Sequence, residues 1–268
     1  MTPIRYRLTL AYDGTAYHGW QVQPRHRTIQ GECERVLQEL SGVRTRVEAS
    51  GRTDTGVHAR GQVAHFDWAA TPRSPAKVQL GLNALLPPDI RVLAVRRVVA
   101  GFHARFSATG KEYRYFIHNA EPILPDCRFY RLPVREPLDV AAMRAAATAL
   151  EGHHDFAAFA ANPNREIDGT CRTIHQFRIT RQGPLIMLQV KGDGFLYRMV
   201  RSLTGFLIRV GHGELTPEHV PAILASGIRT ARVPTAPPQG LFLWRVYYGS
   251  PTTLKKTSSP ATGAPSAR

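Results

Sequence analysis

The sequence predicts an α+β fold in which helices cover one face of a mixed, mainly antiparallel central sheet. Segments in which every second residue is apolar predict strands, and segments with apolar residues every three or four positions predict helices. These segments follow the order strand, helix, strands, helix, strand in each half of the chain. No sequence identity relates the two halves, so their proposed similarity rests on the order of elements.

Five elements are expected in the first half, and local signals set their ends. Asp13-Gly14 is a turn signal that ends a strand, Thr28 is a suitable N-cap, and Pro75 suits the first turn of a helix. Residues 1–105 are therefore interpreted as an N-terminal α/β half. Its elements are a strand over 4–14, a helix over 28–40, a strand over 60–68, a helix over 75–87 and a strand over 90–98.

The second half, residues 106–248, is interpreted as a C-terminal α/β half in which a hairpin turns at Gln182-Gly183. Residues 249–268 are rich in Ser, Thr, Pro, Ala and Gly, so a disordered tail is expected there. The predicted elements are a strand over 111–119, a helix over 138–152, hairpin strands over 171–183 and 184–195, helices over 197–211 and 216–226, and a strand over 241–248.

The charge balance points to a polyanionic partner. The 268 residues include 35 Lys and Arg against 20 Asp and Glu, which gives a net charge of +15 and a pI near 10.4. Nucleic acid is the simplest partner for such an excess, although a generally basic proteome would produce the same balance. A hydrophobic content of 43% is enough for a packed core.

The three cysteines lie far apart and have no C-x-x-C spacing. A disulfide framework or a zinc site is therefore not expected, and a reducing compartment is. No stretch reaches the apolar length of a membrane span, and the N-terminus has no long apolar run before a cleavage site. The sequence thus predicts a soluble, cytoplasmic protein.

The stretch 50-SGRTDTGVHA-59 contains Asp-Thr-Gly, the tripeptide that carries the catalytic carboxylate in aspartic proteases. Those enzymes need two carboxylates that share a proton. This chain has one such tripeptide, so a protease would have to be a symmetric dimer, and Arg52 beside the dyad would hold both carboxylates ionised. From the tripeptide alone, a polar turn with Asp54 bonded to its own backbone is the simpler interpretation.

The complete stretch 50–59 resembles the signature G-R-T-D-x-G-V-H-A of the TruA family of tRNA pseudouridine synthases. Further segments are similar to that family, in the same order, over nearly the whole chain except the tail. The resemblance implies the pseudouridine synthase fold, with two ferredoxin-like halves and the catalytic aspartate in the first. The segments are 11-AYDGTAYHGWQVQP-24, 28-TIQGECE-34, 103-HARFSATGKEYRYFI-117, 152-GHHDFAAF-159, 194-GFLYRMVRSLTGFLIRVG-211 and 236-APPQGLFLWRVYY-248.

The resemblance implies an isomerase that converts uridine to pseudouridine at positions 38, 39 and 40, in the anticodon stem-loop of tRNA. It also implies a homodimer whose RNA path crosses both subunits. The reaction breaks a glycosidic bond and reattaches the same base through carbon, so no cofactor and no metal are expected. The target base must leave the helical stack, which requires a pocket for a flipped base.

The resemblance also assigns roles to individual residues. Asp54 is the carboxylate that acts on the substrate, by covalent attack or by stabilising charge at the sugar. Arg201 is its cationic partner, and Tyr113 stacks on the flipped base or serves proton transfer. Arg52 is expected to handle RNA. His58 either contacts RNA or supports the loop, and the sequence does not distinguish these two roles.

Helical periodicity alone places Arg201 off the apolar stripe of the helix over 197–211, where a solvated side chain is the ordinary expectation. The resemblance instead favours a bidentate ion pair with Asp54. A non-catalytic basic RNA-binding or RNA-folding module is the main alternative function, and a dimeric aspartic protease is a distant one. The joint presence of Asp54, Tyr113 and Arg201 argues against the RNA-binding module.

Overall fold

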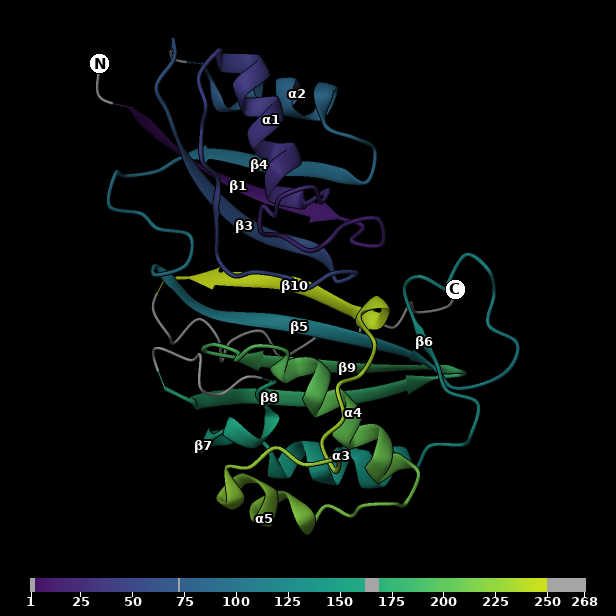
Figure 1. Ribbon diagram of the computed structural model, residues 1–268. Helices are drawn as coiled ribbons and strands as arrows, with labels where there is room; N and C mark the ends of the chain where they lie inside the picture. The colour runs from purple at the N-terminus through teal and green to yellow at the C-terminus, as the bar shows by residue number, and fades with distance from the viewer. Residues whose placement is uncertain (1–2, 72, 162–168, 250–268) are drawn as a thin grey trace, which may run out of the picture.

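The computed structural model describes residues 3–71, 73–161 and 169–249. Within them, ten strands form one mixed sheet in the order β4-β1-β3-β10-β5-β9-β8-β7, with β2 beside β3 and β6 beside β5 (Figure 1). Most strand pairs are antiparallel, which confirms the predicted α+β class. The strands are β1 (Ile4–Tyr12), β2 (Glu48–Ala49), β3 (His58–Trp68), β4 (Ile90–Arg97), β5 (Ala108–His118), β6 (Leu132–Pro133), β7 (Gly152–Asp155), β8 (Cys171–Gln182), β9 (Leu185–Gly192) and β10 (Leu241–Tyr248).

The helices lie in two groups at opposite ends of the sheet (Figure 1). Helices α1 and α2 pack together beside β4, whereas α3, α4 and α5 gather near β7 and β8. Local sequence sets where they start: Thr28 accepts a hydrogen bond from the backbone of Gly31, and Ser74 and Asp139 cap their helices in the same way. The helices are α1 (Ile29–Ser41), α2 (Pro75–Leu85), α3 (Val140–Ala149), α4 (Met199–Gly211) and α5 (His219–Ser226).

Both groups of helices cover the same face of the sheet. In a pleated sheet, residues paired across neighbouring strands point to the same side. A row of paired, buried residues crosses the sheet from the α1 end to the α3 end, so one hydrophobic core extends beneath all the helices. The row consists of Tyr12, Ala59, Leu243, Tyr113, Val190 and Phe177.

Strand β10 joins β3 to β5. It pairs in parallel with β3, where Leu243 lies beside Ala59, and antiparallel with β5, where Leu243 lies beside Tyr113. Strand β10 thus places the start of β3, and the loop before it, next to the middle of β5. The sheet is continuous across residue 105, and the division into halves at that position stays a prediction.

The observed elements match the predicted ones within a few residues at each end. The hairpin turns at Gly183, whose φ of +55° is readily adopted by glycine. The very short strands β2, β6 and β7 had no sequence signal of their own. The predicted disorder of 249–268 concerns residues that, apart from Gly249, lie outside the described part. In the described ranges, no helix has both the length and the apolar character needed to cross a membrane.

Candidate active site

Asp54 lies in the loop between β2 and β3. The preceding residue, Thr53, is fixed by hydrogen bonds to both its backbone and its side chain. The carbonyl oxygen of Thr53 accepts a hydrogen bond from the backbone of Trp20 at 3.0 Å. The hydroxyl of Thr53 lies 2.9 Å from the hydroxyl of Tyr12. A side chain on Gly19 would come within 2.5 Å of the Thr53 carbonyl, so glycine permits this close approach. The loop that presents Asp54 is therefore braced against the first segment of the chain.

An ion pair joins Asp54 to Arg201, 147 residues later in the sequence. Arg201 Nη1 donates to Asp54 Oδ2 at 2.9 Å, while Arg201 Nε donates to the carbonyl oxygen of Ala236 at 2.7 Å. The guanidinium group thus divides its hydrogen bonds between the two partners, where a bidentate contact with the carboxylate was expected. The Arg201 side chain is only 11% exposed, so it is not the solvated residue that helical periodicity alone suggests.

Arg198 supplies a second positive charge beside Asp54. Its Nε lies 3.8 Å from the same oxygen, Oδ2, and its guanidinium carbon is 4.8 Å from the centre of the Tyr197 ring. Arg198 precedes α4 with a φ of +59°, a conformation that costs energy in a residue with a side chain. Nothing in the sequence signals this backbone conformation, so the sequence alone does not single out Arg198 as a site residue.

Tyr113 lies on β5 in the buried row that crosses the sheet, and its side of the strand faces the helices. Its ring packs edge-to-face against Phe195, with the centroids 5.1 Å apart. Burial raises the pKa of Tyr113, and the neighbouring Tyr12 hydroxyl and Asp54 carboxylate raise it further, so the phenol is neutral near pH 7. Tyr115, on the same face, is fully buried and donates its hydroxyl to Pro237, as a core residue does.

His58 is fully buried beside the loop that carries Asp54. Its Nδ1 accepts a hydrogen bond from the Gly14 backbone at 3.0 Å, its Nε2 contacts the Phe129 carbonyl at 2.9 Å, and its ring stacks on Phe242. Burial lowers the pKa of His58, which favours the neutral ring that these hydrogen bonds require. Of the two roles that the sequence left open, this position favours support of the loop.

Arg52, unlike His58, is exposed to solvent. Its side chain is exposed at the start of the same loop, and it forms no hydrogen bond or ion pair with a described residue. The structure therefore separates the predicted site residues into two sets. Asp54, Arg201 and Tyr113 gather at the centre of the sheet, while Arg52 faces outward and His58 is enclosed.

One group in the described part of the chain has the spacing of a metal site: Glu48, His65 and His103. The Nδ1 atoms of His65 and His103 accept backbone hydrogen bonds from Ala104 and Arg105. A neutral ring that accepts at Nδ1 carries its proton on Nε2, so that atom has no lone pair for a metal. The arrangement fits a hydrogen-bonded cluster better than a metal site.

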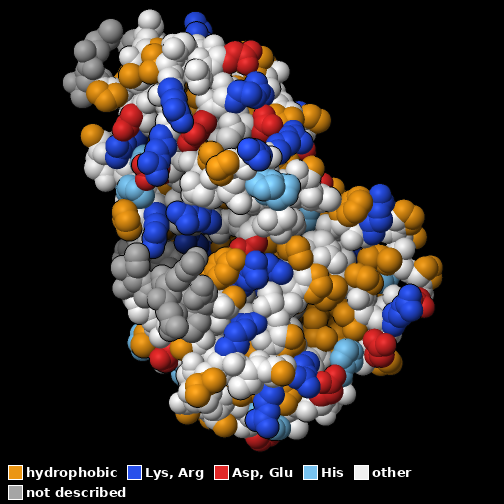
Figure 2. Space-filling view, viewed as in Figure 1, with side chains coloured by type: hydrophobic (Ala, Val, Ile, Leu, Met, Phe, Trp, Pro, Cys, Tyr) orange, Lys and Arg blue, Asp and Glu red, His pale blue; other side chains and the backbone are white. Residues whose placement is uncertain are grey.

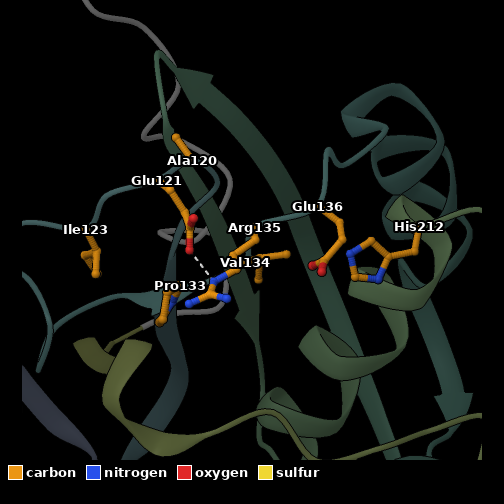
Figure 3. A pocket seen from close by; sticks show the side chains of 8 residues that line it. All are labelled: Ala120, Glu121, Ile123, Pro133, Val134, Arg135, Glu136 and His212. Carbon is orange, nitrogen blue, oxygen red and sulfur yellow. Dashed lines mark ion pairs between the residues drawn. The ribbon is translucent and has the colours of Figure 1, made fainter.

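A surface hollow lies away from Asp54, beside β6 and the end of α4 (Figure 3). Glu121 and Arg135 form an ion pair across it, and His212 closes one side. Neither Asp54, Tyr113 nor Arg201 lines this hollow. The hollow is therefore separate from the residues that gather around Asp54. The face that carries the helices also displays many Lys and Arg side chains (Figure 2).

Comparisons with known proteins point to one family. A family described as tRNA pseudouridine synthase matches residues 9–107, which include Asp54, and 146–249, which include Arg201. A tRNA pseudouridine synthase A from Moorella thermoacetica is 47% identical over 249 residues, which cover 90% of this chain and 98% of that protein. Proteins with the same name from Chlamydia trachomatis and Halalkalibacterium halodurans are 44% and 46% identical, over 91% and 90% of this chain and 92% and 91% of their own lengths.

Proposed function

Since the chain belongs to the tRNA pseudouridine synthase family, we propose that it isomerises uridines 38, 39 and 40 in the anticodon stem-loop of tRNA. As a member of this family it is an isomerase that acts on tRNA. The observation that best supports Asp54 as the reacting group is its ion pair with Arg201, which the fold brings from the other half of the chain.

The ion pair orients the Asp54 carboxylate. Arg201 binds Oδ2, and Arg198 approaches the same atom, whereas Oδ1 forms no hydrogen bond with a described residue. Oδ1 is therefore the oxygen available to attack the ribose or the base of a flipped uridine. The two guanidinium groups hold Oδ2 in place while the other oxygen reacts.

The net reaction needs no external reagent. The bond between ribose C1′ and uracil N1 breaks, and a bond between C1′ and C5 forms. C5 loses a proton and N1 gains one, so atoms and electrons balance without an oxidant or an energy source. Tyr113, a neutral phenol within the reach of Asp54's charge, is proposed to contact the flipped base and assist the proton transfer.

We propose that the active protein is a homodimer in the cytoplasm, with the RNA path crossing both subunits. The resemblance to the TruA family supports the dimer. The net charge of +15 supports an extended phosphate-binding surface, and the three described cysteines are free thiols, as expected in a reducing compartment.

The test is site-resolved pseudouridine mapping on tRNA incubated with wild type, Asp54→Asn and the control Asp126→Asn. Asp126 is exposed and forms no described side-chain contact, so its variant should behave as wild type. Wild type should modify positions 38 to 40, and Asp54→Asn should modify none while still binding tRNA. Modification by Asp54→Asn would refute its proposed role.

The same experiment also tests the alternative function, a non-catalytic RNA-binding module. A basic RNA-binding module would bind tRNA in all three forms and leave every uridine unchanged. Modification of other uridines by wild type would keep the isomerase activity and overturn the proposed positions.

A further inference from the structure

Lys111 is a partly buried cation that the site described above leaves unexplained. It lies on β5, two residues before Tyr113, so both side chains point to the same face of the sheet. Its partners across the sheet are Gly192 on β9 and Val246 on β10, neither of which carries charge. The side chain is mostly buried, yet its ammonium group forms no hydrogen bond or ion pair with a residue in the described ranges.

The ammonium group of Lys111 rests directly against Gly51, at the start of the loop that carries Asp54. A Cβ atom at Gly51 would lie 2.9 Å from Lys111 Nζ. Gly51 does not have a positive φ, so glycine is not needed there for an unusual backbone conformation. Its lack of a side chain instead leaves space for the ammonium group of Lys111. The position of the loop and the position of the ammonium group are therefore linked.

The groups that face Lys111 make its charge less favourable. Burial lowers the pKa of Lys111 to about 8, and the positive charges of Arg105 and Arg172 lower it further. Among the residues that the structure describes, no acidic side chain acts on Lys111 in the opposite direction. The neighbouring acid on the same strand, Glu112, points to the other face and binds Arg114. A buried cation without a counter-charge costs stability, and such costs concentrate where a ligand supplies the missing charge.

We propose that Lys111 binds a backbone phosphate of the tRNA strand that carries the target uridine, and so seats that strand over the Asp54 loop. This inference rests on the proposed function. A phosphodiester would supply the negative charge that no described residue places beside Lys111. Because the ammonium group touches the Asp54 loop at Gly51, a phosphate held there lies next to the position where the uridine must be flipped.

Binding measurements test the proposal in the Asp54→Asn background, where substrate is not converted. Lys111→Met keeps the length and apolar stem of the side chain and removes its charge. We expect tRNA to bind about tenfold more weakly, with the slope of log K against log salt shallower by about 0.7–0.9, the loss of one phosphate contact. Lys77→Met removes an exposed lysine on α2 and should change neither quantity. An unchanged affinity and slope for Lys111→Met would overturn the proposal.

The Gly51→Ala variant tests the geometry. The added methyl group meets only the flexible end of Lys111, so the protein should fold while its ammonium group is displaced. We expect Gly51→Ala to weaken tRNA binding, and to have almost no further effect when Lys111 is already Met. Equal losses in both backgrounds would show that Gly51 acts independently of Lys111.

The pH dependence separates binding from chemistry. The ammonium group is charged below a pH of about 8 and neutral above it, so wild-type affinity should fall from pH 7.5 to pH 9. Lys111→Arg stays charged throughout and should lose less affinity over that range. In turnover with the native Asp54, Lys111→Met should raise KM and leave kcat within about threefold.

A large fall in kcat with unchanged tRNA affinity would place Lys111 in the chemical step and overturn its assignment to phosphate binding. Failure of the proposed function has a different signature, because wild type itself would then form no pseudouridine at any position.

Discussion

At the scale of single residues, the site depends on how one guanidinium group is shared. Arg201 uses Nη1 for Asp54 and Nε for the Ala236 carbonyl, so its orientation is set by the backbone as much as by the carboxylate. This division leaves Asp54 Oδ1 without a hydrogen bond to a described residue, as its proposed attack on the substrate requires. Arg198, whose φ is +59°, adds charge near Oδ2 without occupying Oδ1.

Arg201→Lys should reduce kcat at least about tenfold, because one ammonium group cannot hold both Asp54 and the Ala236 carbonyl in the planar arrangement of a guanidinium. Single-turnover rates of pseudouridine formation measure this effect. Arg209→Lys, on the same helix but bound to the exposed Glu214, is the matched control and should retain most activity. A fully active Arg201→Lys would show that the orientation of Asp54 does not depend on the guanidinium.

At the scale of elements, the packing of α4 against the segment before β10 holds Arg201 in place. The carbonyl of Arg201 accepts a hydrogen bond from the backbone of Ala236 at 3.0 Å. One turn later, Gly205 meets the carbonyl of Pro234, to which an added Cβ would approach within 2.2 Å. Glycine inside a helix lowers the stability of that helix relative to alanine. At position 205, glycine is nevertheless favoured because it permits the close contact with Pro234.

Gly205→Ala should lower the free energy of unfolding by about 1–3 kcal/mol, because the clash with a backbone atom outweighs the helical preference of alanine. The displaced segment carries Ala236, so activity should also fall at temperatures where the variant stays folded. Urea unfolding and initial rates measure the two effects. Gly101→Ala meets no atom within 4 Å and should change neither, and a stable, active Gly205→Ala would contradict the packing argument.

At the scale of the whole molecule, the continuous sheet positions the candidate site, and the net charge favours a polyanionic partner. Strand β10 lies between β3 and β5, and the Asp54 loop meets α4 through the ion pair between Asp54 and Arg201. The helix-covered face that carries this site also displays basic side chains (Figure 2). A folded RNA can therefore be held by many phosphate contacts while one base reaches Asp54.

The affinity of the Asp54→Asn variant for tRNA should fall at least about a hundredfold between 50 and 200 mM salt, as expected for several phosphate contacts. Filter binding or fluorescence titration measures it. As a control, the turnover rate of wild type at saturating tRNA should change far less, because the chemistry involves no counterion release. A flat binding response would mean that phosphate contacts do not dominate the interface.

The sequence by itself determined the class of fold and the approximate ends of its main elements, and it singled out Asp54 as the candidate reacting residue. Periodicity, capping residues and the 50–59 motif are local signals. The tertiary structure decided how Arg201 divides its contacts, that His58 is enclosed, and that Arg198 and Lys111 lie where they do. These features depend on contacts between strands and helices that are distant in the sequence. A pattern along the sequence shows which face of an element a residue occupies. The residues that it contacts are set by the register of β10 and the packing of α4.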